Sequence, residues 1–209
     1  QQAARKERAG LIDLKGRLDA IVEASATLRQ FKNQILMDIT SEGLRIQLVD
    51  EKNRPMFLAS SAQLRPYTRD LLRQIGRALN EVDHRISLSG HTDASQYAGG
   101  ERGFSNWELS SNRANAARRE LVGGGLEAGK MIRVVGLADT IPLNVDDPFD
   151  PINRRISIIV LNKSTEEAIR SQTSSAVIDL RDRPEEELPA EEDAIGGRMF
   201  EGLPPVPPG

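Results

Sequence analysis

The sequence predicts an α/β (α+β) fold: a two-layer sandwich in which helices cover one side of a mixed β-sheet. From Ile35 onward, runs with a two-residue period alternate with runs of helical period, in the order β-β-α-β-α-β-β. Each helical run carries one apolar face, which needs a sheet to pack against. The run Ile156–Leu161 is almost continuously apolar, which is typical of a strand in the middle of a sheet.

An amphipathic helix is predicted before the sheet. Apolar residues recur at near-helical spacing between charged residues from Leu11 to about Phe31. We therefore assign residues 1–34 to a linker and this helix. Its polar face mixes both charges and lacks a basic stripe, which favours a structural brace or a dimer contact over a lipid-binding helix.

A β-hairpin is predicted next. Residues 35–39 and 44–48 alternate between apolar and polar side chains, and Ser41-Glu42-Gly43 separates the two runs. The side chains expected to face solvent are Asp38, Thr40, Arg45 and Gln47.

The remaining elements follow in order. A helix after Pro66 has one apolar face, and a strand over residues 85–89 is expected to stop at Gly90. The next helix has a capping-box signal in Ser105 and Glu108 and ends at the glycines 123–125. Two further β-rich runs, 131–137 and 156–161, complete the predicted sheet.

Charge divides the chain into two unlike parts. Residues 1–163 hold 24 basic and 20 acidic side chains, whereas residues 164–209 hold 4 and 11, together with six of the eleven prolines. We assign residues 35–163 to one globular domain and residues 164–209 to an acidic, Pro-rich tail. A weak helical stretch is expected at 165–170, and disorder from about residue 172, because that composition offers too little apolar surface to bury.

Composition also excludes several classes of function. The absence of cysteine excludes disulfides, thiolate metal sites and a cysteine nucleophile, and we expect neither a metal nor a cofactor. No apolar run approaches the roughly 18 residues of a membrane span. The start at Gln1, without Met or a signal segment, suggests a truncated or processed chain. Eight aromatic residues and nearly balanced charge disfavour nucleic acid as a partner.

The most informative candidate site combines Asp93 and Arg113. Asp93 follows a strand that stops at a glycine, near the start of the next helix, and Arg113 lies two turns into that helix. If both side chains face one pocket, they offer an acceptor and a bidentate donor, which suits a zwitterion. The alternative is an ion pair between them that only fastens the loop.

Three motifs in this order resemble the OmpA-like peptidoglycan-binding domain family. They are Gly90-His91-Thr92-Asp93, Asn106-Trp107-Glu108-Leu109-Ser110-Ser111-Asn112-Arg113-Ala114, which matches N-x-x-L-S-x-x-R-A, and Asn153-Arg154-Arg155-Ile156. The resemblance covers about residues 35–163 and implies an OmpA-like fold. It also implies that Asp93 and Arg113 bind the diaminopimelate of a peptidoglycan stem peptide.

The same motifs supply three weaker candidates for peptidoglycan binding: Thr92, Asn106 and Arg155. For Asn106, a helix-capping role is the alternative to ligand contact. For Arg154 and Arg155, protection of a sheet edge is the alternative. The Gly-rich loop over residues 94–104 is expected either to cover the pocket or to open it.

Within this family the chain is similar to one branch, the MotB-type flagellar stator proteins, through residues 54–57, 104–110 and 133–136. The resemblance implies the periplasmic part of a single-pass inner-membrane protein whose membrane helix is absent from this chain. The implied function is non-catalytic anchoring of the proton-driven stator to the cell wall. The implied partners are peptidoglycan, a second copy in a homodimer, MotA through the missing membrane segment, and the flagellar P-ring region.

Two alternative functions remain open at this stage. One is an envelope protein or lipoprotein that tethers peptidoglycan through the same domain. The other is a cell-wall hydrolase, which the sequence disfavours. Ser89, His91 and Asp93 are spaced two apart on one strand, so their side chains point outward in parallel and cannot converge as a triad.

Overall fold

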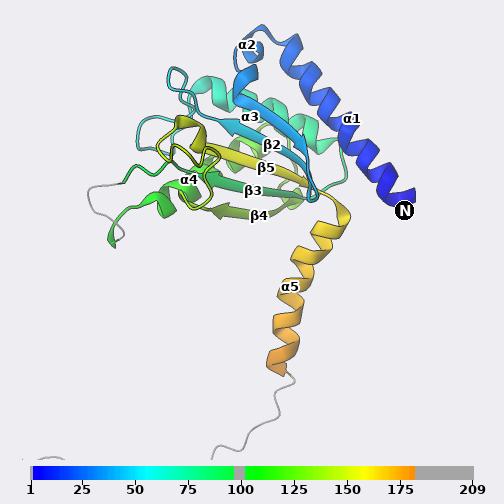
Figure 1. The fold of residues 1–209 in the computed structure, drawn as a ribbon. Coiled ribbons are helices and arrows are strands. Elements are labelled where there is room, and N and C mark those ends of the chain that lie inside the picture. The colour runs from blue at the N-terminus through cyan, green and yellow to red at the C-terminus, as the bar shows by residue number, and fades with distance from the viewer. Residues whose placement is uncertain (1, 97–101, 182–209) are drawn as a thin grey trace, which may run out of the picture. The chain divides into compact units, whose positions relative to one another are not determined.

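The computed structural model describes residues 2–96 and 102–181. Up to Arg170, helices pack on a five-stranded sheet (Figure 1). The strands are β1 (Ile35–Ile39), β2 (Gly43–Val49), β3 (Ile86–His91), β4 (Met131–Gly136) and β5 (Arg155–Leu161). The α-helices are α1 (Gln2–Ala24), α2 (Ala26–Arg29), α3 (Pro66–Asn80), α4 (Asn106–Gly123) and α5 (Lys163–Arg181). Short 3-10 helices lie at Lys32–Gln34 (η1), Ala128–Lys130 (η3) and Pro151–Asn153 (η4).

The sheet is mixed, with strand order β1-β2-β5-β3-β4. Strand β5 runs antiparallel to both β2 and β3, whereas β3 and β4 are parallel. The last strand therefore lies in the middle of the sheet, as its continuous apolar run predicts. The predicted fold class, a mixed sheet with helices on one side, is confirmed.

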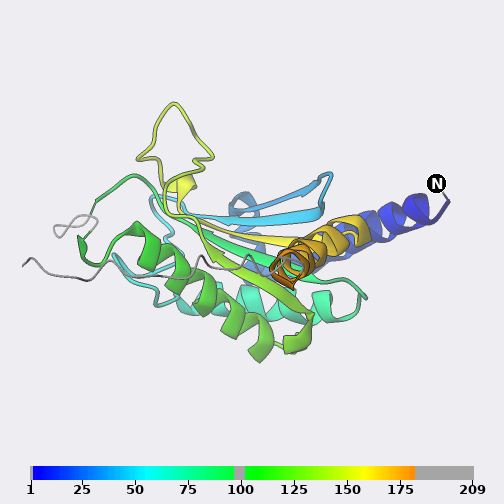
Figure 2. The same ribbon diagram turned by 90° about the horizontal axis from the view of Figure 1, so that it is seen from below.

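Helices α3 and α4 lie below the sheet in Figure 2. The core lies between the two layers and is built from the apolar faces of α1, α3 and α4 and the helix-facing side of the strands. Its fully buried members include Leu14, Leu72, Leu121, Ile46, Leu88 and Ile158. Helix α1 belongs to this core, since Leu11, Leu14, Leu18 and Val22 are all buried.

The predicted bounds of the N-terminal helix are wrong at both ends. It begins at Gln2 and stops at Ala24 instead of running from Leu11 to Phe31. Ser25 has an extended backbone (φ −93°, ψ 116°), and its side chain accepts a hydrogen bond from the amide of Leu28, which starts the separate turn α2. Because Ser25 caps α2 in an extended conformation, it cannot continue α1. The spacing of the apolar residues does not reveal this break between the two helices.

The prediction that Gln47 faces solvent is also wrong. Gln47 is buried, and its Oε1 accepts a hydrogen bond from Nε of Arg155 at 3.0 Å. Strand β2 is flanked by strands on both sides. On the sheet face opposite the helices, Arg155 also donates to the carbonyl of Ile141, so segment 137–154 lies against that face.

Strand β3 runs two residues beyond its predicted stop, through Gly90 to His91. Gly90 does not end the strand. A Cβ at this position would lie 2.2 Å from the carbonyl oxygen of Ser110 in α4, so the position has no room for a side chain. Gly90 thus permits close packing of the helix on the strand.

The C-terminal prediction is wrong over residues 172–181, because α5 continues to Arg181. Residues 182–209, which carry the rest of the predicted disordered tail, lie outside the described residues. Residues from Ser171 onward form a unit separate from residues 1–170. Within the part of the chain that the structure describes, no helix is both long enough and apolar enough to cross a membrane.

The contact between Gly90 and α4 can be tested by substitution. We expect Gly90→Ala to lower the free energy of unfolding by about 2–3 kcal/mol, because the added methyl group forces α4 away from β3. Gly16→Ala is the control, since a Cβ added to Gly16 in α1 would have no atom within 4 Å. This control should raise the free energy of unfolding by about 0.5–1 kcal/mol through helix propensity. Urea denaturation followed by circular dichroism measures both, and an unchanged Gly90→Ala midpoint would contradict the packing described.

Candidate functional site

A cavity of about 380 Å³ lies where β3 ends and α4 begins. Four of the five residues predicted as binding residues line it: Thr92, Asp93, Asn106 and Arg113. The other charged lining residues are Asp50, Arg65 and Arg154. Side chains from four separate stretches of the sequence therefore meet at one end of the sheet.

The strand register explains why these stretches meet. Arg155 at the start of β5 pairs with Val49 at the end of β2 and with His91 at the end of β3. One step beyond each paired position lie Arg154, Asp50 and Thr92. The residues that flank these three neighbouring strands therefore lie close together at one end of the sheet.

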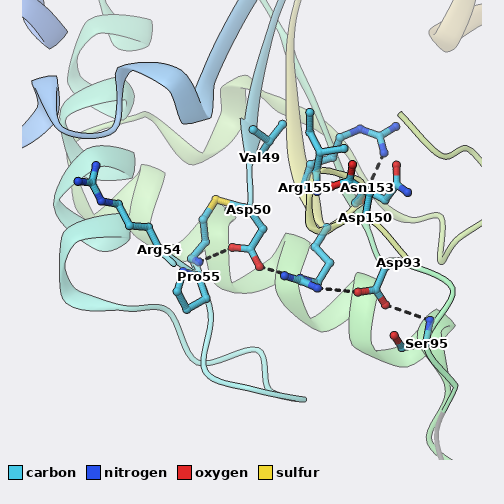
Figure 3. Close-up of polar contacts among 12 residues, drawn as sticks. Val49, Asp50, Arg54, Pro55, Asp93, Ser95, Asp150, Asn153 and Arg155 are labelled. Carbon is cyan, nitrogen blue, oxygen red and sulfur yellow. Dashed lines mark hydrogen bonds and ion pairs between the residues drawn. The ribbon is translucent and has the colours of Figure 1, made fainter. Parts of the chain in front are cut away.

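Asp93 is held from two sides. Its Oδ1 accepts a hydrogen bond from the backbone amide of Ser95 at 3.0 Å, and its Oδ2 accepts one from Nη1 of Arg154 at 2.7 Å (Figure 3). Because the ion pair of Asp93 is with Arg154, the simple Asp93–Arg113 salt bridge that the sequence left open is wrong. Asp93 and Arg113 instead present separate charges to the same cavity.

Arg113 is buried against an aromatic ring. Its guanidinium carbon lies 4.7 Å from the ring centroid of Phe57, and its Nε donates to the carbonyl of Ser61 at 2.9 Å. The stacking fixes the plane of the guanidinium, so its orientation toward the cavity is set before any ligand arrives.

Thr92 contributes a hydroxyl with unused hydrogen-bonding capacity. Its backbone amide donates to the carbonyl of Ala138 at 2.9 Å, which anchors the residue. Its Oγ1 is buried and has no hydrogen-bond partner among the described residues. A buried hydroxyl left unpaired carries a free-energy cost that a ligand group in the cavity would remove.

Sequence reasoning missed Asp50 as a cavity residue, and it named Arg155 where the structure places Arg154 in the cavity wall. Nε of Arg154 donates to Oδ2 of Asp50 at 2.7 Å, so the guanidinium bridges the carboxylates of Asp50 and Asp93 (Figure 3). Burial raises the pKa of Asp50, against the hydrogen bonds from Met56 and Arg154. Burial by itself would lower the pKa of Arg154. The hydrogen bonds to Asp50 and Asp93 and the attraction of their charges outweigh burial, so the pKa of Arg154 is raised.

Arg155 does not line the cavity. Its guanidinium bonds Gln47 and the carbonyl of Ile141, on the sheet face away from the helices. Edge protection is also excluded, because β5 is the central strand. Burial, together with the charge of Arg45, lowers the pKa of Arg155 to about 10. Consecutive residues point to opposite faces, so only one of the two arginines can reach the cavity.

Asn106 organises the cavity wall instead of capping the helix. Its Nδ2 donates to the carbonyls of Asp93 at 3.3 Å and Ser95 at 3.0 Å, which ties the start of α4 to the end of β3. The cap is Ser105, which forms the predicted capping box with Glu108. Residues 97–101 of the Gly-rich loop lie outside the described residues, so the position of this loop over the cavity stays a prediction.

His91 does not form a triad. Its Nε2 lies 3.2 Å from Oγ of Ser89, while both oxygens of Asp93 are engaged by Ser95 and Arg154. Burial, followed by the charge of Arg155, lowers the pKa of His91 to about 4. Among the described residues, no group of three or more metal-ligating side chains is present.

The buried histidine predicts a pH dependence of stability. The folded-state pKa is about 4, below the ordinary value of 6.5, so the unfolded chain takes up the proton first as pH falls. The stabilisation is complete above pH 6.5 and is lost between pH 6.5 and 4, by about 3 kcal/mol. We expect His91→Gln to lose less stability across this window than the unmodified protein in urea titrations.

The bridging guanidinium predicts a coupling between substitutions. Arg154→Met leaves the carboxylate of Asp50 buried without its partner and should lower the free energy of unfolding by about 3 kcal/mol. Adding Asp50→Asn should restore part of that loss, because the uncompensated charge is gone. Arg45→Met, which breaks the exposed pair with Asp38, should cost less than about 1 kcal/mol. Additive effects of the Asp50 and Arg154 substitutions in denaturation experiments would contradict the bridge.

Comparisons with known proteins agree with this geometry. The family model described as the OmpA family matches residues 56–154. Motility protein B of Escherichia coli (strain K12) is 51% identical over 172 residues, which is 82% of this chain and 56% of that protein. A putative truncated flagellar export/assembly protein LafU from the same strain is 34% identical, over 74% of this chain and 72% of that protein. This chain spans about half the length of Motility protein B.

Solved structures share the fold. A putative MotB-like protein from Desulfovibrio vulgaris superposes with a TM-score of 0.62 at 18% identity, over 76% of this chain and 98% of that one. The cell wall anchor of the type VI secretion system from Pseudomonas aeruginosa gives 0.51 at 25% identity, over 63% and 90%. The matched family model, the sequence identity and the shared fold together place this chain in the OmpA family, in the branch that contains Motility protein B.

Proposed function

We propose that residues 35–163 bind peptidoglycan noncovalently and thereby anchor a flagellar stator complex to the cell wall. The observation that carries the proposal is the cavity in which Asp93, the unpaired hydroxyl of Thr92 and the stacked guanidinium of Arg113 come together. Membership of the Motility protein B branch supports the stator assignment.

The charges of the cavity suit a zwitterionic ligand. Arg154 is shared between Asp50 and Asp93, so the carboxylate of Asp93 is held as a fixed acceptor. Arg113 supplies a donor from a different wall of the cavity. The side-chain end of diaminopimelate carries an ammonium and a carboxylate on one carbon. The ammonium would bind Asp93 and Thr92, and the carboxylate would bind Arg113.

The proposed role is binding without catalysis. Asp93 is fixed by Arg154 and the Ser95 amide, and neither the hydroxyl of Ser89 nor His91 contacts it. A small cavity of this kind cannot carry a large mechanical load alone, so anchoring requires several copies acting together. We therefore include a homodimer, MotA through a membrane segment, and the P-ring region among the proposed partners. The proposed location is the periplasmic part of an inner-membrane protein.

Cosedimentation with purified peptidoglycan tests the binding site. Asp93→Asn and Arg113→Gln should each weaken binding at least about tenfold, which corresponds to the loss of one charge-assisted hydrogen bond. The matched controls are Asp38→Asn on β1 and Arg119→Ala, an exposed residue on the same helix as Arg113. Free diaminopimelate should compete with the unmodified protein. If all variants pellet equally while remaining folded by circular dichroism, the cavity is not the binding site.

Two further measurements separate the alternatives. Soluble muropeptides released during incubation with peptidoglycan, detected by chromatography, would indicate a hydrolase and contradict pure anchoring. Swimming of cells that carry the full-length gene with Arg113→Gln distinguishes a stator from a passive tether. A stator predicts lost motility with an intact envelope, whereas a tether predicts an envelope defect.

A further inference from the structure

The aromatic side chains of this protein fall into two groups. Among the residues that the structure describes, three are packed inside: Phe31 stacks on Tyr67 with centroids 4.5 Å apart, and Phe57 lies under Arg113. The other three are exposed: Phe104 by 46%, Trp107 by 44% and Phe149 by 63%. Exposed apolar side chains that gather on one surface are typical of a site that contacts another molecule.

Each of the three exposed aromatic residues lies close along the backbone to a residue at the cavity. Phe104 and Trp107 stand on either side of the Ser105-Asn106 pair at the start of α4, and Asn106 lines the cavity. Phe149 follows Pro148, whose carbonyl accepts a hydrogen bond from the amide of Ala94, next to Asp93. Figure 2 shows segment 137–154 and the start of α4 at the same end of the sheet.

Segment 137–154 is held in one conformation. The buried side chain of Asn153 accepts hydrogen bonds from the amides of Leu143 at 2.7 Å and Asn144 at 2.8 Å, and donates to the carbonyl of Asp147 at 2.9 Å. The carboxylate of Asp147 in turn accepts from the amide of Phe149 at 3.0 Å. A surface that is already ordered binds with little further loss of conformational entropy.

The chemistry of this surface favours a neutral, hydroxyl-rich partner. Exposed carboxylates of Asp139, Asp146 and Asp147 alternate with exposed Ile141 and Val145. A second copy docking through the same segment would bring these like charges together, at a cost in free energy. The ring of an N-acetylated hexosamine offers an apolar face to an aromatic side chain, and its hydroxyl and amide groups donate to carboxylates.

We propose that Phe104, Trp107 and Phe149 form a glycan subsite beside the cavity. It would contact the N-acetylhexosamine rings of the strand that carries the bound stem peptide. This inference rests on the proposed peptidoglycan-binding function, because the stem peptide in the cavity brings its covalently attached sugars to the neighbouring surface. The cavity would then bind the stem peptide, and the glycan subsite would add affinity by contacting the attached sugar.

The sole tryptophan of the sequence is Trp107, so intrinsic tryptophan fluorescence reports on this subsite alone. The intact chain is titrated with two probes: a diaminopimelate-containing stem tetrapeptide, and the same peptide attached to the N-acetylglucosaminyl-N-acetylmuramyl disaccharide. We expect the disaccharide probe to bind about tenfold more tightly, because its sugar rings add contacts with aromatic side chains that the bare peptide lacks. It should also change the emission of Trp107 more strongly than the peptide alone.

Variants assign the gain to particular rings. Isothermal calorimetry should show that Trp107→Ala and Phe149→Ala lose most of the tenfold gain and keep the affinity for the bare peptide. Ile12→Ala removes an equally exposed apolar side chain on α1 and should keep the gain. Equal affinity of the unmodified protein for both probes, or a full gain in Trp107→Ala, overturns the subsite and leaves peptide binding intact. Failure of the bare peptide to bind overturns the proposed function and the subsite together.

Discussion

The bridge from Arg154 to Asp50 and Asp93 is the interaction on which the site depends. It joins the ends of β2 and β3 to the start of β5, three neighbouring strands of the sheet. The guanidinium donates a hydrogen bond to each carboxylate in a place where water has little access, so removing Arg154 would leave two buried carboxylates without this partner. The bridge also decides which way Asp93 points, and therefore which part of its carboxylate remains for a ligand.

The second constraint is the close approach of α4 to β3. Gly90 and Gly136 have no side chain, so the backbone and side chains of Ser110 and Ser111 lie directly against the strands. With the helix this close, Arg113 lines the same cavity as Asp93, and the ring of Phe57 lies against its guanidinium. The capping box at Ser105 sets where the helix begins, and Asn106 links that start to the strand end. Backbone packing brings Asp93 and Arg113 to one cavity.

The Asn153-Arg154-Arg155 motif serves both faces of the sheet. Asn153 organises segment 137–154, Arg155 supports that segment from β5, and Arg154 reaches the cavity on the other side. Three consecutive residues can do this because side chains alternate where the chain enters a strand. Asn153 and Arg155 therefore hold the segment that carries the exposed Phe149, while the intervening Arg154 lines the cavity.

The sequence alone determined the fold class, the central position of the last strand and the capping box at Ser105, because each is written in local periodicity or in neighbouring residues. It also identified Asp93 and Arg113, which line the same cavity. Only the tertiary structure decided that Asp50 joins them, that Arg154 and not Arg155 faces the cavity, and that Gln47 is buried. Asp50 and Arg154 are separated by 104 residues and meet because β2 pairs with β5. No local pattern encodes which strands become neighbours, and that pairing sets which side chains share a buried environment.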